Sequence, residues 1–310
     1  KSQFRNYAAF LQGDVAVTDR LTLHTGVRYE HAELKVDTYN TIDRSNVTQD
    51  NVTVQGGNPD FNETLFNAGV VYQATDQLQL FANYSEGFGM PDVGRVLRGI
   101  SDAGQDVDNL LVLEPIITDN REIGGRFDWD RYHVEVSYYE SDSDFGERLT
   151  EVNGTWVGNR EKTEIQGVEI TADADLNDAH NLAFSYTYAD GESDTDGDGD
   201  VDTELSGINI APETLKLSWS AAWTKRLSSH LQFTQFLDRD IEGDDLDFDG
   251  YGLVDGSMAY RTRAGKFSLG IENLLDKDYF TYYSQSARVS DEYYFQGRGR
   301  TVTLGYQLDF

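Results

Sequence analysis

Apolar and polar residues alternate along much of this chain with a period of two. The clearest stretch is TVTLGYQLDF at 301–310, in which every second residue from Val302 to Phe310 is apolar. Successive side chains of a β-strand point to opposite faces of a sheet, so this pattern predicts strands with one apolar and one polar face. The same alternation recurs at 21–30, 131–140, 180–190 and 213–223.

The pattern predicts about thirteen strands, and the connections between them alternate in length. We expect the strands near 4–17, 21–35, 63–74, 78–88, 119–128, 131–145, 160–174, 180–190, 213–223, 229–240, 251–262, 266–275 and 299–310. Short turns at 18–20, 75–77, 128–130, 177–179, 225–226 and 263–265 alternate with polar loops at about 36–62, 89–117, 146–158, 191–211, 240–250 and 276–298. The short and long connections therefore fall at opposite ends of the sheet.

Strands of about ten residues with such unequal connections are typical of an outer-membrane β-barrel, with short periplasmic turns and long extracellular loops. Lipid cannot satisfy backbone polar groups, so a spanning sheet must close on itself and turn its apolar face outward. Aromatic residues near strand ends suit the two membrane interfaces; these are Tyr29, Tyr84, Trp129, Tyr188 and Trp223. We therefore predict an all-β fold, a transmembrane antiparallel β-barrel, as a single domain over 1–310. A soluble β-sandwich is the alternative, although its loops have no reason to alternate in length.

Composition narrows the function. The net charge of −30 argues against DNA or RNA as a partner, because binding a phosphate backbone requires a basic face. The chain has no cysteine, which excludes disulfides, thiolate metal sites and cysteine catalysis. Its five histidines are scattered without metal-ligand spacing, so we expect no enzyme activity.

The sequence shows no run of about 18 apolar residues and no signal peptide at its start. An odd number of strands does not close a bacterial single-chain barrel, which uses an even number. We therefore expect this chain to be the C-terminal part of a longer barrel.

Five segments, taken in order, resemble the TonB-dependent outer-membrane receptors. They are NYSEGFGMPDV (83–93), LEPIITDNREIGGRF (113–127), VGNREKTEIQGVEI (157–170), LGIENLLDKDYF (269–280) and GRGRTVTLGYQLDF (297–310). The resemblance implies a barrel of about 22 strands around an N-terminal plug domain. On that template this chain supplies roughly strands 10 to 22, while the plug and the segment that contacts TonB lie outside it.

The resemblance also implies a function, namely active import energised through TonB. Haem receptors of the family carry Phe-Arg-Ala-Pro, whereas this chain has Phe88-Gly89-Met90-Pro91 and lacks their following Asn-Pro-Asn-Leu, so haem is disfavoured. A ferric siderophore is the expected cargo, with cobalamin, other metal chelates and oligosaccharides as alternatives. The expected surroundings are outer-membrane lipid and lipopolysaccharide.

Candidate substrate contacts lie in the long loops. Tyr282, Tyr283 and Arg288 belong to a tyrosine-rich loop whose rings and guanidinium can stack on and hydrogen-bond an iron chelate. Arg95 and Arg98 can pair with an anionic chelate. The alternative for both groups is ordinary loop packing and charge balance.

The stretch SDTDGDGDVDTE at 193–204 places Asp194, Asp196, Asp198, Asp200 and Asp202 at alternate positions. An EF-hand loop requires a Glu at its twelfth position and flanking helices; here the twelfth residue is Leu205 and the flanks are expected strands. An EF-hand is excluded, but Ca²⁺ bound in an extracellular loop stays a hypothesis, beside the alternative of a solvated acidic loop. No other cofactor is expected.

Two further functional classes stay open at this level. One is a self-contained channel or translocator barrel, which requires the first and last strands of this chain to pair. The other is a cell-surface calcium-binding β-protein, in which the acidic loops would be the main functional element.

Overall fold

The computed structural model describes residues 1–41, 52–100, 104–110, 113–152, 155–240, 247–286 and 295–308. Three short helical segments lie among the strands, α1 (Val93–Gly99), the 3-10 turn η1 (Val107–Asn109) and α2 (Tyr282–Ser286). The strands are β1 (Ser2–Thr18), β2 (Leu21–Val36), β3 (Tyr39–Asn40), β4 (Thr53–Val54), β5 (Asp60–Gln73), β6 (Leu78–Gly89), β7 (Ile116–Trp129), β8 (Tyr132–Val152), β9 (Thr155–Asn177), β10 (His180–Ser193), β11 (Thr203–Glu204), β12 (Thr214–Ala222), β13 (Leu227–Phe236), β14 (Tyr251–Thr262), β15 (Gly265–Glu272) and β16 (Thr301–Gln307).

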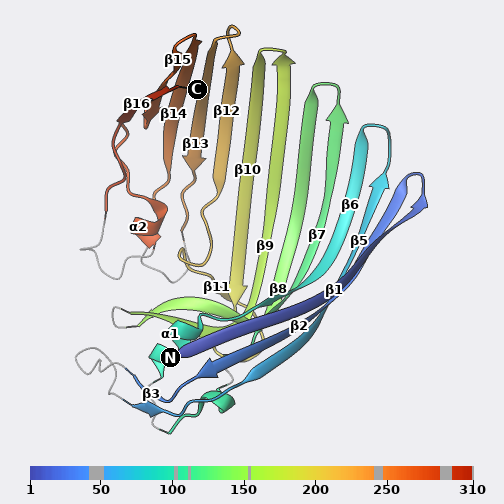
Figure 1. The fold of residues 1–310 in the computed structure, drawn as a ribbon, viewed down its shortest axis with the longest axis vertical. Coiled ribbons are helices and arrows are strands. Elements are labelled where there is room, and N and C mark those ends of the chain that lie inside the picture. Colours follow the sequence, from blue (N-terminus) through green and yellow to red (C-terminus); the bar gives the residue numbers. More distant parts are fainter. Residues whose placement is uncertain are drawn as a thin grey trace.

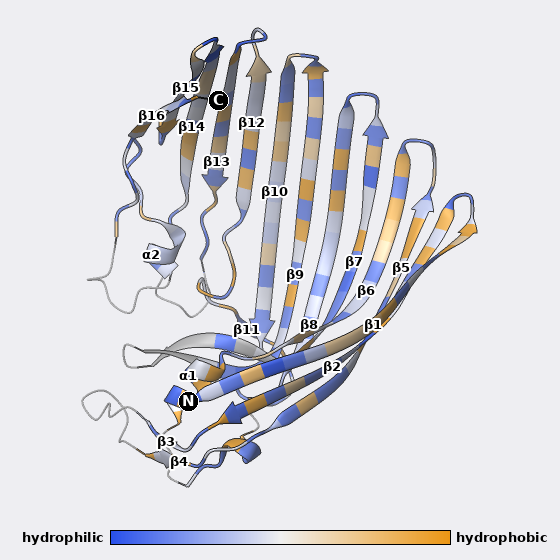
Figure 2. Ribbon diagram, viewed as in Figure 1, coloured by the Kyte–Doolittle hydropathy of each residue, from blue (hydrophilic) through white to orange (hydrophobic). Residues whose placement is uncertain are grey.

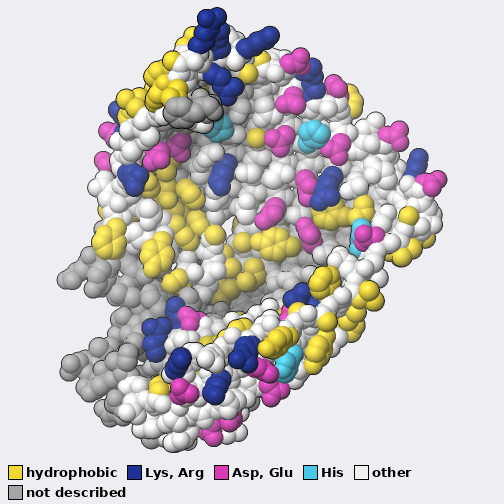
Figure 3. Space-filling model, viewed as in Figure 1, with side chains coloured by type: hydrophobic (Ala, Val, Ile, Leu, Met, Phe, Trp, Pro, Cys, Tyr) yellow, Lys and Arg dark blue, Asp and Glu magenta, His cyan; other side chains and the backbone are white. Residues whose placement is uncertain are grey.

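One antiparallel sheet of 14 strands contains nearly all of them, in the order β1-β2-β5-β6-β7-β8-β9-β10-β12-β13-β14-β15-β16, with β11 paired to β10. Each long strand pairs with its neighbour in sequence, because short turns return the chain at one end of the sheet. The sheet curls around a hollow (Figures 1 and 3). This arrangement confirms the predicted all-β antiparallel fold, and it is a single curled sheet rather than the two packed sheets of a sandwich.

The two ends of the sheet differ as the sequence predicts. Short turns join β1 to β2, β5 to β6, β7 to β8 and the later pairs at the top of Figure 1, while α1, α2 and β11 lie at the other end. β1 and β16 are the two edges of the sheet. The described strands therefore do not form the closed ring that a self-contained barrel requires.

One predicted loop is wrong. The stretch at 146–158 was expected to be a polar loop, but β8 continues to Val152 and β9 begins at Thr155, so both strands run through it. The register between them shifts between Ser143 and Gly146. The residues at 146–158 do not alternate regularly between apolar and polar, so the pattern carries no strand signal there.

Each long strand presents an apolar face and a polar face, seen as alternating bands along the strands in Figure 2. On β12, Leu217 lies between Phe184 and Phe233 in the ladder and is 46% exposed. The next residue, Ser218, lies on the other face between Ala183 and Gln232. A row of exposed apolar side chains across neighbouring strands has no partner in water but suits a lipid environment.

A small core lies beneath the connections at the end with the long loops. Leu34 and Val36 of β2 share a face with Arg28 and pack against Leu97 of α1. Val54, Val107 and Leu113 complete this cluster. The β6–β7 connection thus folds onto the polar face of the sheet, and in Figure 1 α1 lies within its curl. This places the polar face toward the hollow.

None of the described helices is long and apolar enough to cross a membrane.

An introduced charge should cost very different amounts of stability on the two faces of β12. Leu217→Arg should destabilise the protein by about 2–4 kcal/mol in a lipid bilayer, because a guanidinium at mid-strand on the apolar face loses its hydration. Ser218→Arg, the matched control one residue along, should cost far less because its face is polar. Urea unfolding in lipid vesicles measures both, and equal costs would contradict the assignment of the two faces.

Candidate functional site

The long connections gather chemistry-bearing side chains at one end of the sheet, and this end is the candidate site. Three of them, between β10 and β12, β13 and β14, and β15 and β16, contain described residues that contact one another directly. The β6–β7 connection, which carries α1 and η1, packs against β2 instead.

An aromatic cluster joins β13, β14 and the last connection. Its members are Phe236, Phe248, Tyr251, Tyr279 and Tyr282, with ring centroids 4.5–6.0 Å apart from one ring to the next. Phe248 is 1% exposed, and Tyr251 contacts three of the other rings. Aromatic rings in tilted and edge-on contact at such distances stabilise one another beyond their burial alone. The cluster fixes the connections rather than leaving the rings open to a ligand.

The two neighbouring tyrosines of α2 have different environments. The Tyr282 hydroxyl donates a hydrogen bond to the carbonyl of Ile210, and its ring meets Phe248 edge-on. Burial raises the pKa of Tyr282, so the hydroxyl stays protonated and able to donate. Tyr283 is 72% exposed. Of this predicted pair, the Tyr283 side chain is exposed, while Tyr282 contacts Ile210 and Phe248; Arg288 lies outside the described residues.

Arg95 and Arg98 lie on α1, whose buried residue is Leu97. The Arg95 Nε lies 3.5 Å from the Asp92 carboxylate, and the Arg98 Nε donates to the Gly94 carbonyl at 2.9 Å. Both guanidinium groups thus have local partners. No described contact joins them to Tyr282 or Tyr283, so the predicted substrate residues form two separate groups.

The acidic stretch forms the tip of a short hairpin between β10 and β11. Carboxylate oxygens of Asp194, Asp196 and Asp198 lie within 4.8 Å of one another; Asp200 and Asp202 are outside this group. The tip turns through Gly197 and Gly199, whose φ angles of 78° and 100° suit glycine. Their backbone amides donate to the Asp194 carboxylate at 2.7 and 3.0 Å.

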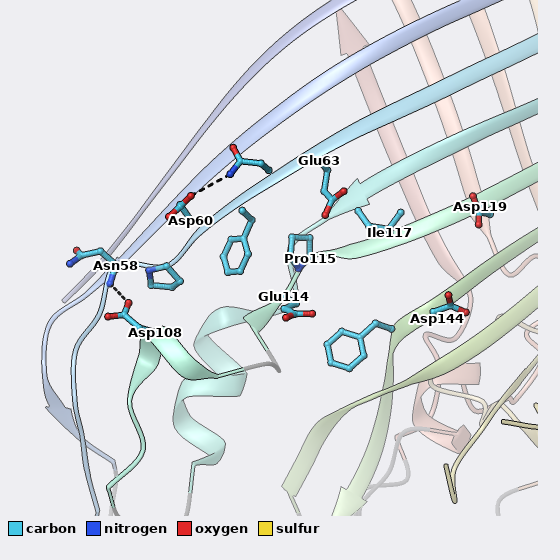
Figure 4. A pocket seen from close by; sticks show the side chains of 13 residues that line it. Asn58, Asp60, Glu63, Asp108, Glu114, Pro115, Ile117, Asp119 and Asp144 are labelled. Atoms are coloured by element: carbon cyan, nitrogen blue, oxygen red, sulfur yellow. Dashed lines mark hydrogen bonds between the residues drawn. The ribbon is translucent and has the colours of Figure 1, made fainter. Parts of the chain in front are cut away.

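A cavity of about 990 Å³ lies at the same end of the sheet, between β5, β7 and β8 (Figure 4). It occupies the place where β5 parts from β6. The ladder between these strands ends at Asn67 and Ser85, and the next amide, that of Phe66, donates to the Glu86 carboxylate at 2.8 Å.

Carboxylates dominate the cavity wall, and none of the described residues lining it is Lys, Arg or His. Phe145 in the wall lies against the Arg160 guanidinium, 4.3 Å from the ring centroid. The carboxylates come from Asp60, Glu63, Asp108, Glu114, Asp119 and Asp144. A concave surface of one sign focuses its field, so this wall attracts cations and repels anions.

Sequence reasoning missed Arg239, which joins two connections. Its side chain is 11% exposed, and its Nη2 donates to the Glu204 carboxylate at 3.3 Å and to the Leu205 carbonyl at 3.2 Å. A signal was present, because Arg239 is the one basic residue in the acidic run at 238–250. The cavity carboxylates left no such signal, since they come from segments far apart in sequence.

Comparison with known proteins gives a consistent picture. A family model described as "TonB dependent receptor-like, beta-barrel" matches residues 1–274. The ferric aerobactin receptor of Klebsiella pneumoniae is 29% identical over 98% of this chain and 44% of its own length. The rhizobactin receptor of Rhizobium meliloti (strain 1021) is 30% identical over 96% of this chain and 42% of its own length.

Among solved structures, the copper transporter OprC matches with a TM-score of 0.78 and 18% identity. The match covers 97% of this chain and 47% of that chain, and at this identity it shows the fold alone. The chain spans less than half the length of each of these relatives.

The contrast between the two α2 tyrosines is testable by substitution. Tyr282→Phe should lower the free energy of unfolding by about 0.5–1.5 kcal/mol, because the Ile210 carbonyl loses its donor. Tyr283→Phe should change it by less, since that hydroxyl lies on an exposed side chain. Urea titration of the two variants measures this difference, and an equal or reversed effect would contradict the assigned roles.

Proposed function

This chain belongs to the TonB-dependent receptor-like β-barrel family of outer-membrane transport receptors, and from this premise we propose that it forms part of a receptor that imports a ferric siderophore. The observation that carries the proposal is the similarity to a ferric aerobactin receptor and a rhizobactin receptor along nearly the whole chain. The fold agrees with it, because a curled sheet with an apolar face and long folded connections at one end suits capture at the cell surface.

In this proposal the long connections face the cell exterior and make first contact with the chelate. Tyr283 offers an exposed ring for stacking. The apolar face contacts outer-membrane lipid, and the ends of the strands beyond it lie among lipopolysaccharide head groups. TonB supplies the energy for import.

Charge bears on the identity of the cargo. Arg95, Arg98 and Arg239 each have a carboxylate or carbonyl partner, and the cavity wall is acidic. A chelate bound here therefore gains little from unpaired cations and more from aromatic contact and neutral hydrogen bonds. We place the chelate against Tyr283 rather than in the acidic cavity.

A second candidate function is calcium binding at the hairpin tip. The three converging carboxylates of Asp194, Asp196 and Asp198 favour it, because like charges this close repel one another unless a cation intervenes. Extracellular calcium modules bind weakly, in the range of about 10⁻⁴–10⁻³ M. Such an ion would order the β10–β12 connection at the mouth of the receptor.

If the protein imports a ferric siderophore, its expression should depend on iron supply and the cell should take up the chelate. In a strain that lacks the full gene, uptake of iron-55 presented as a ferric siderophore should fall to background, and the full receptor should restore it. Expression should rise when iron is withheld. If neither expression nor uptake responds across a panel of chelates, the siderophore proposal fails.

The role of Tyr283 is a separate prediction. Tyr283→Ala should raise the chelate concentration for half-maximal uptake by about two- to ten-fold, because a ring contact contributes about 0.5–1.5 kcal/mol. Tyr283→Phe keeps the ring and should behave as the parent. Equal uptake by all three proteins would remove Tyr283 from the site.

Calcium binding is measured by calorimetric titration of the full receptor with CaCl₂. The double change Asp196→Asn and Asp198→Asn should abolish the heat of binding at this site, because two of the three converging charges are lost. The matched control, Asp200→Asn with Asp202→Asn, changes residues outside the group and should retain it. A double Asn variant at 196 and 198 that titrates like the parent would exclude the hairpin tip.

A further inference from the structure

Three long connections meet in one packed unit, which we call the loop body. It comprises residues 203–210 between β10 and β12, residues 237–240 and 247–250 between β13 and β14, and residues 279–286 between β15 and β16. Each of the three contacts both of the others through described side chains or backbone groups. The strand order alone does not explain these mutual contacts, because the three connections leave the sheet at different places along its edge.

Arg239 joins the first two connections. It stands after β13, and the Glu204 carboxylate and Leu205 carbonyl that accept from its Nη2 stand in the β10–β12 connection. Asp190 of β10 lies 3.9 Å from the same Nη2. The backbone of Arg239 also exchanges two hydrogen bonds with Phe248, at 3.0 and 2.8 Å. Arg239 is therefore fixed in its own connection while its side chain reaches into the neighbouring one.

The helix α2 joins the third connection to the other two. Tyr282 donates to Ile210 of the first and packs its ring on Phe248 of the second, with centroids 4.8 Å apart. The Gln285 amide accepts from the Asp249 backbone at 3.1 Å and donates to its carbonyl at 3.0 Å.

Gly207 shows how closely the first connection approaches α2. A Cβ atom at this position would lie 2.5 Å from the Ser286 Cβ, well inside van der Waals contact. Ser286 is 3% exposed, so it has little room to withdraw. Close packing of this kind resists any sliding of one connection past another.

Because the Arg239 guanidinium is buried, separating it from its partners is the energetically costly step in pulling the loop body apart. Moving the first or the second connection alone would separate the Arg239 guanidinium, which is 11% exposed, from Glu204 and Leu205, and a buried charge that loses partners is unfavourable. The third connection is held to the other two by Tyr282 and Gln285. We propose that Arg239 is a positioning residue that keeps the described segments of the loop body together as one packed unit.

The coupling concerns how the three connections pack against one another, and it does not depend on which cargo the receptor carries. Failure of the siderophore proposal would therefore leave it standing, and the experiment below uses no ligand.

Hydrogen exchange of the full-length receptor in detergent, followed by mass spectrometry, tests the coupling. Arg239→Gln should accelerate amide exchange by at least about ten-fold in 203–210 and 279–286 together, because these segments open through shared contacts. The barrel strands should keep their protection, which separates uncoupling from general unfolding. Arg239→Lys should show the same pattern more weakly, because an ammonium lacks the fork that bridges two acceptors.

Two further variants make the test decisive. Gly207→Val, which forces the first connection away from Ser286, should accelerate exchange in the same segments without touching Arg239. Arg226→Gln changes an arginine in the turn between β12 and β13, at the other end of the sheet, and should leave the loop body unaffected. Acceleration confined to the segment around 237–240, or none in any Arg239 or Gly207 variant, would overturn the proposal.

Discussion

The constraint on which this structure depends is that every long strand finds its backbone partners only in its neighbours. In lipid no water is available to satisfy an amide or carbonyl, so the antiparallel ladder must run without interruption from strand to strand. In the described residues each strand on the path from β1 to β16 pairs with the next along much of its length. Side chains are then free to divide by face, apolar toward lipid and polar toward the hollow. Where the ladder fails, between β5 and β6, the Glu86 side chain takes the place of a backbone acceptor for Phe66.

In the connections outside the sheet, side chains rather than strand ladders satisfy the backbone polar groups. These connections also carry the candidate functional residues. Arg239 satisfies a carboxylate and a carbonyl of another connection, and Gln285 satisfies both backbone groups of Asp249. These bonds turn irregular segments into a packed surface on which an exposed ring such as Tyr283 is held in place. Preorganisation of this kind lowers the entropy that binding would otherwise lose. The acidic hairpin tip stands apart from this packing, with its carboxylates largely in solvent.

Much of the fold could be predicted from sequence because a period of two is a local property. β14 spans Tyr251–Thr262, and the pattern predicted 251–262. The loop body could not be predicted, because its contacts join residues far apart in the chain, such as Tyr282 and Ile210, and depend on which connections lie side by side. For the candidate site, the sequence named individual residues but not their surroundings. Arg95 and Arg98 were placed with the substrate but have local partners, Tyr283 is exposed as a contact must be, and the grouping of Asp194, Asp196 and Asp198 agrees with the alternating pattern.

We propose that the apolar face of this sheet lies in the outer membrane while the polar face lines a water-accessible interior. Residues 1–310 contain no cysteine, so single cysteines along β12 can be labelled selectively within this chain with a membrane-impermeant maleimide in outer-membrane vesicles. We expect labelling that alternates with a period of two, with 216, 218 and 220 reactive and 215, 217 and 219 protected. Uniform labelling of the six positions, or protection that follows no alternation, would contradict it.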